Sequence, residues 1–416
     1  MNKTLIPQFG PFQGMRVLGT GSLIAMPFAA SMLAEFGAQV IEIERPGVGD
    51  TYRRFGNIYT EGERSVSASW IQDARNRLSM TLELDMNIPD SKEIFFGLIK
   101  QTDIYLENMV WLERMGIKDA DIMNANPKIV IVHISGYGHK EFGGIPETCD
   151  QASYDMIGQA YSGFVLYNGW ENTPPLVVKP SLNDYITAMF ALFGALAAYT
   201  AAQQSGRGQV VDISQFESQA KLMRDAFTSS TLGFEQFKRC GSGANTFQPW
   251  DLFEAAGDSY ICIGAFGPAV FERFVTAIDF DKDKYTFAGV SAGEAAVSSP
   301  LGREFDANVR KWCLDHTPEQ IEAVMRAHKV PCSRVNTPQD CLNSPQYRLR
   351  NDFISYTDQT LQKEVTAFGV FPKLSQTPGR VWRGAPSLGQ DTDRILKELL
   401  GFDGARIEKM RENGVI

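Results

Sequence analysis

The chain has 416 residues, 44% hydrophobic and 21% charged, a balance typical of a folded globular protein and not of a disordered one. This length exceeds the ~100–200 residues of an ordinary domain, so two domains or one large elaborated domain are expected. Acidic residues number 49 against 40 basic ones, for a formal net charge of -9, and the basic residues do not cluster, which disfavours a nucleic-acid partner.

In the first third of the chain, short β-rich runs alternate with amphipathic ones. The pattern predicts strands at residues 15–19, 39–44, 104–107 and 128–134, and helices at residues 27–36 and 91–102. This alternation predicts an α/β fold with a parallel, doubly wound sheet and helices on both faces. Ligands of such sheets bind beyond the carboxyl ends of the strands.

The second half begins with a long predicted helix, from Ser181 to about residue 204. The chain then predicts a strand at residues 209–213, a helix from Ser214 and a loop at residues 241–249. A smaller α/β pattern follows, with a strand at residues 260–265, helices at 269–278, 302–314 and 318–328, and a last helix at 391–400.

No membrane or secretory segment is expected. The apolar run at residues 186–202 is short for a span and is interrupted by Thr187, Gly194 and Thr200, which favours a buried helix. Residues 1–13 contain two prolines and no long apolar run, unlike a signal peptide. The six cysteines are scattered without a CxxC pair, which favours a reduced, cytoplasmic protein.

Neither a metal site nor an NAD site is expected. The histidines, at positions 133, 139, 316 and 328, show no metal-ligand spacing. Residues 19–24 (GTGSLI) resemble the start of a dinucleotide fingerprint, but Ile24 stands where the third glycine belongs. An ordinary strand-to-helix turn is the preferred interpretation.

Asp184, at the start of the long helix, is the most informative acidic residue. Near the positive end of the helix dipole, with an ordinary pKa of ~3.9, it is expected to be ionised at neutral pH. Such a carboxylate can attack a thioester if water is excluded. An aspartate at a helix start is more often a cap, and its position alone leaves both interpretations open.

Two further segments are ambiguous on the residues alone. Arg45 follows the strand at residues 39–44 and can bind a phosphate or lie on an ordinary surface. The run Ser135-Gly136-Tyr137-Gly138 ends a buried strand, where glycines allow a ligand or a tight turn.

Several motifs resemble those of the class III CoA-transferases. Residues 24–30 (IAMPFAA), residues 37–47 (GAQVIEIERPG) and Asp50 are similar to that family's alanine- and proline-rich helix and its GAxVIKIExPxxGD signature. Further similar segments follow in the same order at residues 107–108, 114–116, 135–138, 206–209 and 381–392. Residues 8–11 (QFGP) and 381–384 (VWRG) resemble most the L-carnitine CoA-transferase branch.

The resemblance implies a reaction and a nucleophile. Asp184 corresponds to the family's catalytic aspartate, which attacks an acyl-CoA thioester to give an aspartyl-acyl anhydride and then an aspartyl-CoA thioester. An acceptor carboxylate takes over the CoA by the reverse steps. Coenzyme A is the group carried, and the acid exchanged is expected to be carnitine- or betaine-like, with aromatic and dicarboxylic acids as alternatives.

The resemblance also implies CoA contacts, although the pattern departs from the family's. The family's ENFxPGxxxRxG segment is two residues shorter here, with Met109 in place of the aromatic residue, and the glycine-rich loop is matched only loosely by residues 241–244. The residues expected to contact CoA are Arg45, Asn108, Arg114, Ser135 and Tyr137. An aromatic cage for a trimethylammonium group can come from Tyr154, Tyr161, Trp170 and Trp250, although such residues are also common in cores.

The family fold implies a Rossmann-like large domain made from residues 1–224 and 345–416, with a smaller domain inserted at residues 225–344. It also implies an interlocked dimer, either of two copies or with a homologous chain. α-Methylacyl-CoA racemases share this fold and are the alternative activity. Their catalytic histidine has no counterpart in the nearest stretch, residues 148–154 (TCDQASY), and without a second base a racemase cannot exchange a proton on the other face.

Overall fold

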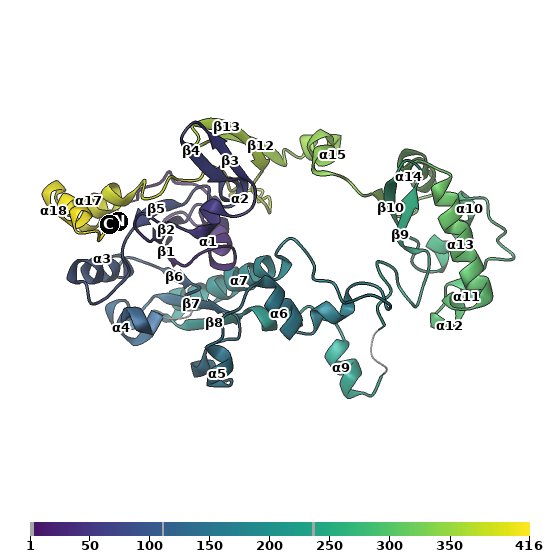
Figure 1. The fold of residues 1–416 in the computed structure, drawn as a ribbon, viewed down its shortest axis with the longest axis horizontal. Helices are drawn as coiled ribbons and strands as arrows, with labels where there is room; N and C mark the ends of the chain where they lie inside the picture. Colours follow the sequence, from purple (N-terminus) through teal and green to yellow (C-terminus); the bar gives the residue numbers. More distant parts are fainter. Residues whose placement is uncertain (1–3, 110–111, 235–237) are drawn as a thin grey trace. The chain divides into compact units, whose positions relative to one another are not determined.

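A computed structural model describes residues 4–109, 112–234 and 238–416 (Figure 1). The chain forms two compact units, of which the first comprises Met1–Phe164, Val177–Thr228 and Arg348–Ile416. The second comprises Val165–Leu176 and Ser229–Tyr347. The second unit is therefore built from two segments, whereas the sequence analysis placed residues 165–176 in the large domain.

The first unit is built on a six-stranded sheet in the order β5-β2-β1-β6-β7-β8, in which every pairing is parallel. In chain order within the sheet this is 3-2-1-4-5-6, the doubly wound arrangement, so the predicted fold class is confirmed. The strands are β1 (Arg16–Thr20), β2 (Gln39–Glu44), β5 (Leu78–Thr81), β6 (Ile104–Glu107), β7 (Val130–Ser135) and β8 (Val210–Ser214). Strands β2 and β6 match their predicted ranges, whereas β5, with only two apolar residues, was not predicted.

Helices cover both faces of this sheet because successive side chains of each strand point to opposite faces. Helices α1 (Ala25–Glu35) and α7 (Leu182–Ser205) pack on the face that presents Val132 and Ile134 of β7. The opposite face presents Tyr105 and Ile131 to a second apolar core. Its helices are α3 (Pro89–Ile99), α4 (Asp119–Ala125), α17 (Thr392–Leu400) and α18 (Gly404–Glu412).

Helix α7 matches the predicted long helix in extent but is less buried than expected. Its 24 residues, about 36 Å at 1.5 Å per residue, are long and apolar enough to span a membrane by length and composition, and only 33% of its apolar window is buried. Its alanines pack against α1 and β7, as in the core helix of a globular domain. Met189 and Phe193 are 46% and 73% exposed, so one apolar face is left open.

The end of the chain returns to the first unit and covers its sheet. Figure 1 shows α17 (yellow), from the C-terminal segment, beside α3 from the first quarter of the chain, and the two helices are in contact. Asp391 accepts the N–H of Ser79, and Thr392 accepts the N–H of Thr81, at 3.0 and 2.9 Å. The outer edge of β5 is thereby protected.

The second unit has an antiparallel sheet in the order β11-β10-β9. Its strands are β9 (Trp250–Ala255), β10 (Ser259–Gly264) and β11 (Cys332–Arg334), and its longer helices are α10 (Pro268–Ala277), α13 (Pro300–Leu314) and α14 (Pro318–Ala327). These elements enclose a separate core that includes Phe253, Phe271 and Phe305. As predicted, residues 241–249 form neither helix nor strand.

Shorter elements complete both units. In the first unit they are β3 (Ile58–Glu61), β4 (Arg64–Ser67), α2 (Ala68–Asp73), α5 (Pro146–Cys149), α6 (Asp155–Tyr161), α8 (Gln215–Ala220), β12 (Phe353–Asp358) and β13 (Lys363–Phe368). In the second they include α11 (Phe287–Val290), α12 (Glu294–Val297) and α15 (Pro338–Asn343).

Candidate active site at the start of helix α7

The carboxylate of Asp184 is held by a glutamine from the end of the neighbouring strand. Gln215 follows β8 directly, and its Nε2 donates to Asp184 Oδ1 at 2.6 Å. The Oε1 of Gln215 accepts the hydroxyl of Ser153 at 2.7 Å, which orients the amide with its nitrogen toward Asp184. One carboxylate oxygen is thus fixed by a directed hydrogen bond.

Asp155, and not Asp184, caps helix α7. Its Oδ1 accepts the backbone N–H groups of Asn183 and Asp184, at 2.7 and 3.2 Å, and its Oδ2 accepts Nε2 of Gln159 at 2.8 Å. Ser181, which precedes the helix with φ 33°, makes no side-chain cap. Of the two interpretations of Asp184 that its position left open, the cap is therefore wrong.

These surroundings change the acidity of Asp184. Burial, and next the negative charge of Asp155, raise the pKa of Asp184 to about 7, although the hydrogen bond from Gln215 opposes the shift. Full ionisation at neutral pH was expected from the ordinary value, and this expectation is wrong. A carboxyl group with a pKa near neutral, beside a second carboxylate, is the kind of perturbed group that marks catalytic sites.

Two glycines allow the segments around Asp184 to come together. A Cβ on Gly136 would lie 2.2 Å from Cβ of Ser153, and a Cβ on Gly158 would lie 2.1 Å from Nδ2 of Asn183. Any larger residue at these positions would displace the groups that hold Asp184 and Gln215.

The next residue, Tyr185, anchors the helix start on its other side. Its hydroxyl donates to Oδ2 of Asp73 at 3.1 Å, and the hydroxyl of Tyr52 donates to the same oxygen at 2.8 Å. The Tyr185 ring packs edge-on against Phe28 of α1, with 4.8 Å between ring centroids. The first turn of α7 is therefore held both by the polar group around Asp184 and by this aromatic contact.

An aromatic group lies next to the residues that hold Asp184. Tyr137 and Tyr161 pack edge-on at 4.9 Å between centroids, and Tyr161 packs on Phe216 at 5.3 Å. Because Phe216 follows Gln215 directly, this group lies beside the carboxylate's hydrogen-bond partner.

The four residues expected to form an aromatic cage are divided between the two compact units. Tyr154 and Tyr161 belong to the first compact unit, whereas Trp170 and Trp250 belong to the second. Trp250 packs on Phe247 within that second unit. A cage made by all four residues stays a prediction, and within the first unit Tyr161 packs with Tyr137 and Phe216.

Of the five residues expected to contact CoA, Ser135 ends β7 and the other four come after strands of the parallel sheet, but their local roles differ. Asn108 binds both backbone groups of Ser22, accepting its N–H at 3.0 Å and donating to its carbonyl at 2.9 Å. This pair joins the ends of β1 and β6, where the strand order reverses and doubly wound sheets bind ligands. Ser135 accepts the N–H of Gly138 at 2.8 Å and closes the turn that holds Tyr137.

The two arginines of this set are exposed. Nε of Arg45 lies 3.5 Å from Oε2 of Glu83, and 70% of the Arg45 side chain is accessible. Arg114 lies in the exposed part of the 3₁₀ helix η2 (Leu112–Met115). The roles of Arg45, Asn108, Arg114, Ser135, Tyr137 and Asp184 remain predictions.

Asp155, Gln215 and Ser153 were not predicted as site residues. Gln215 had a usable signal, because it comes two residues after the predicted strand at residues 209–213, where the carboxyl-edge rule expects functional groups. Asp155 begins a seven-residue helix that was not predicted, and its proximity to Asp184 arises only from tertiary packing.

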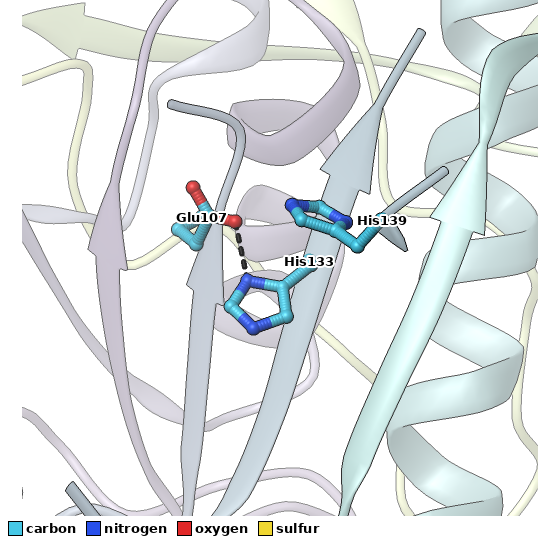
Figure 2. A group of neighbouring side chains, drawn as sticks. All are labelled: Glu107, His133 and His139. Atoms are coloured by element: carbon cyan, nitrogen blue, oxygen red, sulfur yellow. Dashed lines mark hydrogen bonds and ion pairs between the residues drawn. The ribbon is translucent and has the colours of Figure 1, made fainter. Parts of the chain in front are cut away.

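A second polar cluster lies at the ends of β6 and β7, formed by Glu107, His133 and His139 (Figure 2). Nδ1 of His133 lies 2.5 Å from Oε1 of Glu107, and Nε2 of His133 lies 2.9 Å from Oδ2 of Asp119. Burial lowers the pKa of His133, but hydrogen bonds and charges from Asp119 and Glu107 outweigh it and raise the pKa to about 10. No metal-ligand grouping was expected from sequence spacing, yet side chains from separate segments meet here.

Comparison with known proteins gives the family. The model of CoA-transferase family III matches residues 12–392. The chain is 33% identical to the bile acid CoA-transferase BaiK of Clostridium scindens, over 98% of this chain and 90% of that protein. It is 31% identical to the succinyl-CoA–D-citramalate CoA-transferase of Chloroflexus aurantiacus, over 98% of each.

Other relatives act as subunits, and solved structures share the fold. The beta subunit of the succinyl-CoA–L-malate CoA-transferase of Chloroflexus aurantiacus is 28% identical over 98% of each chain. A CAIB/BAIF family protein from Brucella suis superposes with a TM-score of 0.81 at 21% identity, covering 94% of this chain and all of that one. The motifs, the doubly wound sheet and these similarities agree: the chain belongs to CoA-transferase family III.

Proposed function

We propose that Asp184 is the nucleophile of a reaction that moves CoA from an acyl-CoA thioester to a free carboxylic acid. The observation that carries this proposal is the placement of its carboxylate. It is half-buried at a helix start, it does not cap that helix, and a glutamine holds one of its oxygens. The other oxygen is left to attack.

The reaction proceeds by exchange at the Asp184 carboxyl. An Asp184 oxygen attacks the thioester carbonyl carbon, the C–S bond breaks, and an aspartyl-acyl anhydride and CoA thiolate form. The thiolate then attacks the aspartyl carbonyl of the anhydride, which expels the donor carboxylate and leaves an aspartyl-CoA thioester. The acceptor carboxylate attacks this thioester and expels the thiolate. In the last step the thiolate attacks the acceptor's own carbonyl in the new anhydride, which returns Asp184 as a carboxylate.

The carboxyl edge of the sheet supports a CoA site. Arg45 and Arg114 present exposed guanidinium groups there, suited to phosphates. Asn108 and Ser135, whose side chains bind nearby backbone, shape the turns that the nucleotide contacts, and Tyr137 belongs to the aromatic group beside Gln215.

Three classes of carboxylic acid are candidates for the CoA acceptor. The aromatic group of Tyr137, Tyr161 and Phe216 favours a carnitine- or betaine-type acid, whose trimethylammonium group binds aromatic faces, or a bulky apolar acid. Relatives named for a bile acid and for citramalate make apolar and dicarboxylic acids the alternatives. A screen of acyl-CoA donors against acids of all three classes separates them.

Replacement of the nucleophile tests the reaction. Asp184→Ala is expected to lose CoA transfer by at least ~10⁴-fold while the circular dichroism spectrum and Tm stay close to those of the parent. Asp150→Ala, at an exposed aspartate on the preceding segment, is the control and is expected to keep full activity. If Asp184→Ala still exchanges CoA between two acids at a normal rate, the nucleophile is assigned wrongly.

The covalent intermediate gives a second readout of the same proposal. Incubation with acyl-CoA and hydroxylamine should place a hydroxamate on Asp184, detected by peptide mass spectrometry. A hydroxamate on another carboxylate would overturn the assignment. Deuterium wash-in at the α-carbon of a branched acyl-CoA, without transfer, would instead indicate the racemase alternative.

We also propose that the protein is dimeric and cytoplasmic. The exposed apolar face of α7 around Met189 and Phe193 supports association with a second copy or with a homologous chain, as the subunit names of relatives suggest. All six cysteines are free thiols in the structure, in keeping with a reducing compartment.

A further inference from the structure

The cluster in Figure 2 draws Glu107 from β6, His133 from β7 and His139 from the segment after β7, and the neighbouring strand β8 supports it. Glu107 of β6 pairs with His133 of β7, and His133 pairs with Asp212 of β8, so their side chains lie side by side on one face of the sheet. This is the face opposite α7, because the neighbours of His133 in β7, Val132 and Ile134, pack against the alanines of α7. The cluster is therefore separated by the sheet from the helix that carries Asp184.

The imidazole of His139 completes the group. His139 follows β7 in the turn closed by Ser135 and lies over His133, with 4.6 Å between ring centroids. One ligand atom from each of Glu107, His133 and His139 lies within 4.8 Å of the others. Glu107 and His133 are 1% and 5% exposed, whereas 27% of the His139 side chain is accessible, which provides a route from solvent.

In each of the two imidazoles, one nitrogen is hydrogen-bonded to a carboxylate that orients the ring. Nε2 of His133 lies 2.9 Å from Asp119, and Nδ1 of His139 lies 2.7 Å from Oδ1 of Asp212. This leaves Nδ1 of His133 and Nε2 of His139 on the side of Glu107. A histidine that binds a metal almost always has its second nitrogen bonded to a carboxylate, carbonyl or water, and here both histidines have a carboxylate.

We propose that Glu107, His133 and His139 bind a divalent transition metal ion, Zn²⁺ in the first place. Two imidazoles and one carboxylate are a donor set that Zn²⁺ takes at ~2.0–2.2 Å, so only small side-chain movements are needed to reach it. Three carboxylates, including those of Asp119 and Asp212, surround the two imidazoles and favour a divalent cation. The ion takes the place of the proton between Glu107 and His133, which is released.

The position of the site gives it a structural role. Glu107 immediately precedes Asn108, and His139 follows the turn that contains Tyr137, so the ion would join two loops at the carboxyl edge of the sheet. The proposal does not depend on the identity of the nucleophile or of the acid, because metal binding is measured without turnover.

Metal content of the full chain tests the proposal. After incubation with ZnSO₄ and extensive desalting, the parent protein is expected to retain about one zinc per chain by plasma mass spectrometry. Titration with Co²⁺ should give the visible absorption of a four- or five-coordinate N/O site. A parent protein that retains no zinc and gives no such spectrum overturns the proposal, and the cluster is then a protonated histidine held between two carboxylates.

Matched histidine variants locate the ion. His139→Ala is expected to lose the bound zinc. His316→Ala is expected to keep it, because Nδ1 of His316 is hydrogen-bonded to the backbone carbonyl of Trp312, four residues earlier in the chain. Asp212→Asn keeps all three ligands but weakens the support of His139, and should lower zinc affinity by roughly 10–100-fold. If His139→Ala fails to fold, Asp212→Asn and the Co²⁺ spectrum decide; zinc retained at parental affinity by the variants at residues 139 and 212 overturns the site.

Discussion

At the scale of single residues, the reactivity of Asp184 is set by two side chains that lie far from it in sequence. Gln215 fixes one carboxylate oxygen and is itself fixed by Ser153. Asp155 holds the helix N–H groups that would otherwise stabilise the Asp184 carboxylate, and adds a negative charge beside it. Gln215 therefore positions the carboxylate, and burial together with the charge of Asp155 makes it more basic.

Gln215→Ala is expected to lower kcat by roughly 10–100-fold with little change in KM, because a hydrogen bond to a charged group is worth ~1.5–3 kcal/mol. Gln219→Ala is the control, since Gln219 lies one turn further along α8, is also buried, and its side-chain amide has no hydrogen-bond partner within the described parts of the chain. Steady-state kinetics and thermal unfolding of both variants provide the measurement. Equal losses of kcat in both would show that the effect comes from packing of α8.

Asp155→Asn is expected to move the pH dependence of kcat/KM. Asp184 attacks only when ionised, so activity of the parent should rise with pH through about 7. Removal of the Asp155 charge lowers the pKa of Asp184, so the rise should occur at lower pH, while the asparagine oxygen still caps α7. A pH–rate profile checks this, with exposed Asp150→Asn as control; an unchanged profile would contradict the role of Asp155.

At the scale of elements, helix α7 connects the site to the sheet. Its first turn carries Asp184, its alanines pack on β7, and its last turn ends at Gly206 with φ 73°. The following turn brings the chain directly against the start of β7, where Gly208 donates its N–H to the carbonyl of Pro127 at 2.8 Å. This turn determines the register of β8, and hence the position of Gln215.

Gly208→Ala is expected to destabilise the fold more than Gly206→Ala. A Cβ at Gly208 would lie 1.8 Å from the carbonyl oxygen of Ile129, a backbone atom that cannot move freely. A Cβ at Gly206 meets nothing within 4 Å, so that variant costs only the left-handed conformation, about 1 kcal/mol. Urea unfolding of the two variants provides the comparison, and equal stabilities would contradict the close approach at Gly208.

At the scale of the whole molecule, the first unit is assembled from three separate segments of the chain. Residues from the C-terminal segment cover the β5 edge and supply α17 and α18 to one of the two cores. Helix α7 belongs to the layer on the opposite face of the sheet, and its outer face is apolar and exposed in a single chain. An apolar groove along this face is lined by Tyr185, Ile186, Met189, Phe190, Phe193 and Leu222.

Phe193→Asp is expected to convert a dimer into a monomer, because it places a charge in the middle of the face that we propose is covered by a second chain. Phe142→Asp, at a residue that is 57% exposed and belongs to the 3₁₀ helix η3 (Lys140–Phe142), should leave the dimer intact. Light scattering coupled to size-exclusion chromatography measures both masses. A parent protein that is already monomeric would contradict the dimer.

Much of the sheet was predictable, because its signals are local. The ranges of β2 and β6 follow from apolar runs bounded by turn residues, and the start of α7 follows from Pro180-Ser181. The missed elements carry weak local signals: β5 has two apolar residues, and β9 is recognisable mainly through its pairing with β10. The partial exposure of α7 was missed because hydrophobicity does not reveal which face a neighbour covers.

The sequence by itself determined the α/β class, the family and the candidacy of Asp184, since all three rest on residue types in a fixed order along the chain. Only the tertiary structure decided what Asp184 does locally, because Asp155 and Gln215 lie 29 and 31 residues away from it. The same holds for His133 and His139, whose carboxylate partners come from other segments. Hydrogen bonds and Coulomb interactions act over a few ångströms in space, so the acidity of a side chain depends on which segments the fold brings beside it.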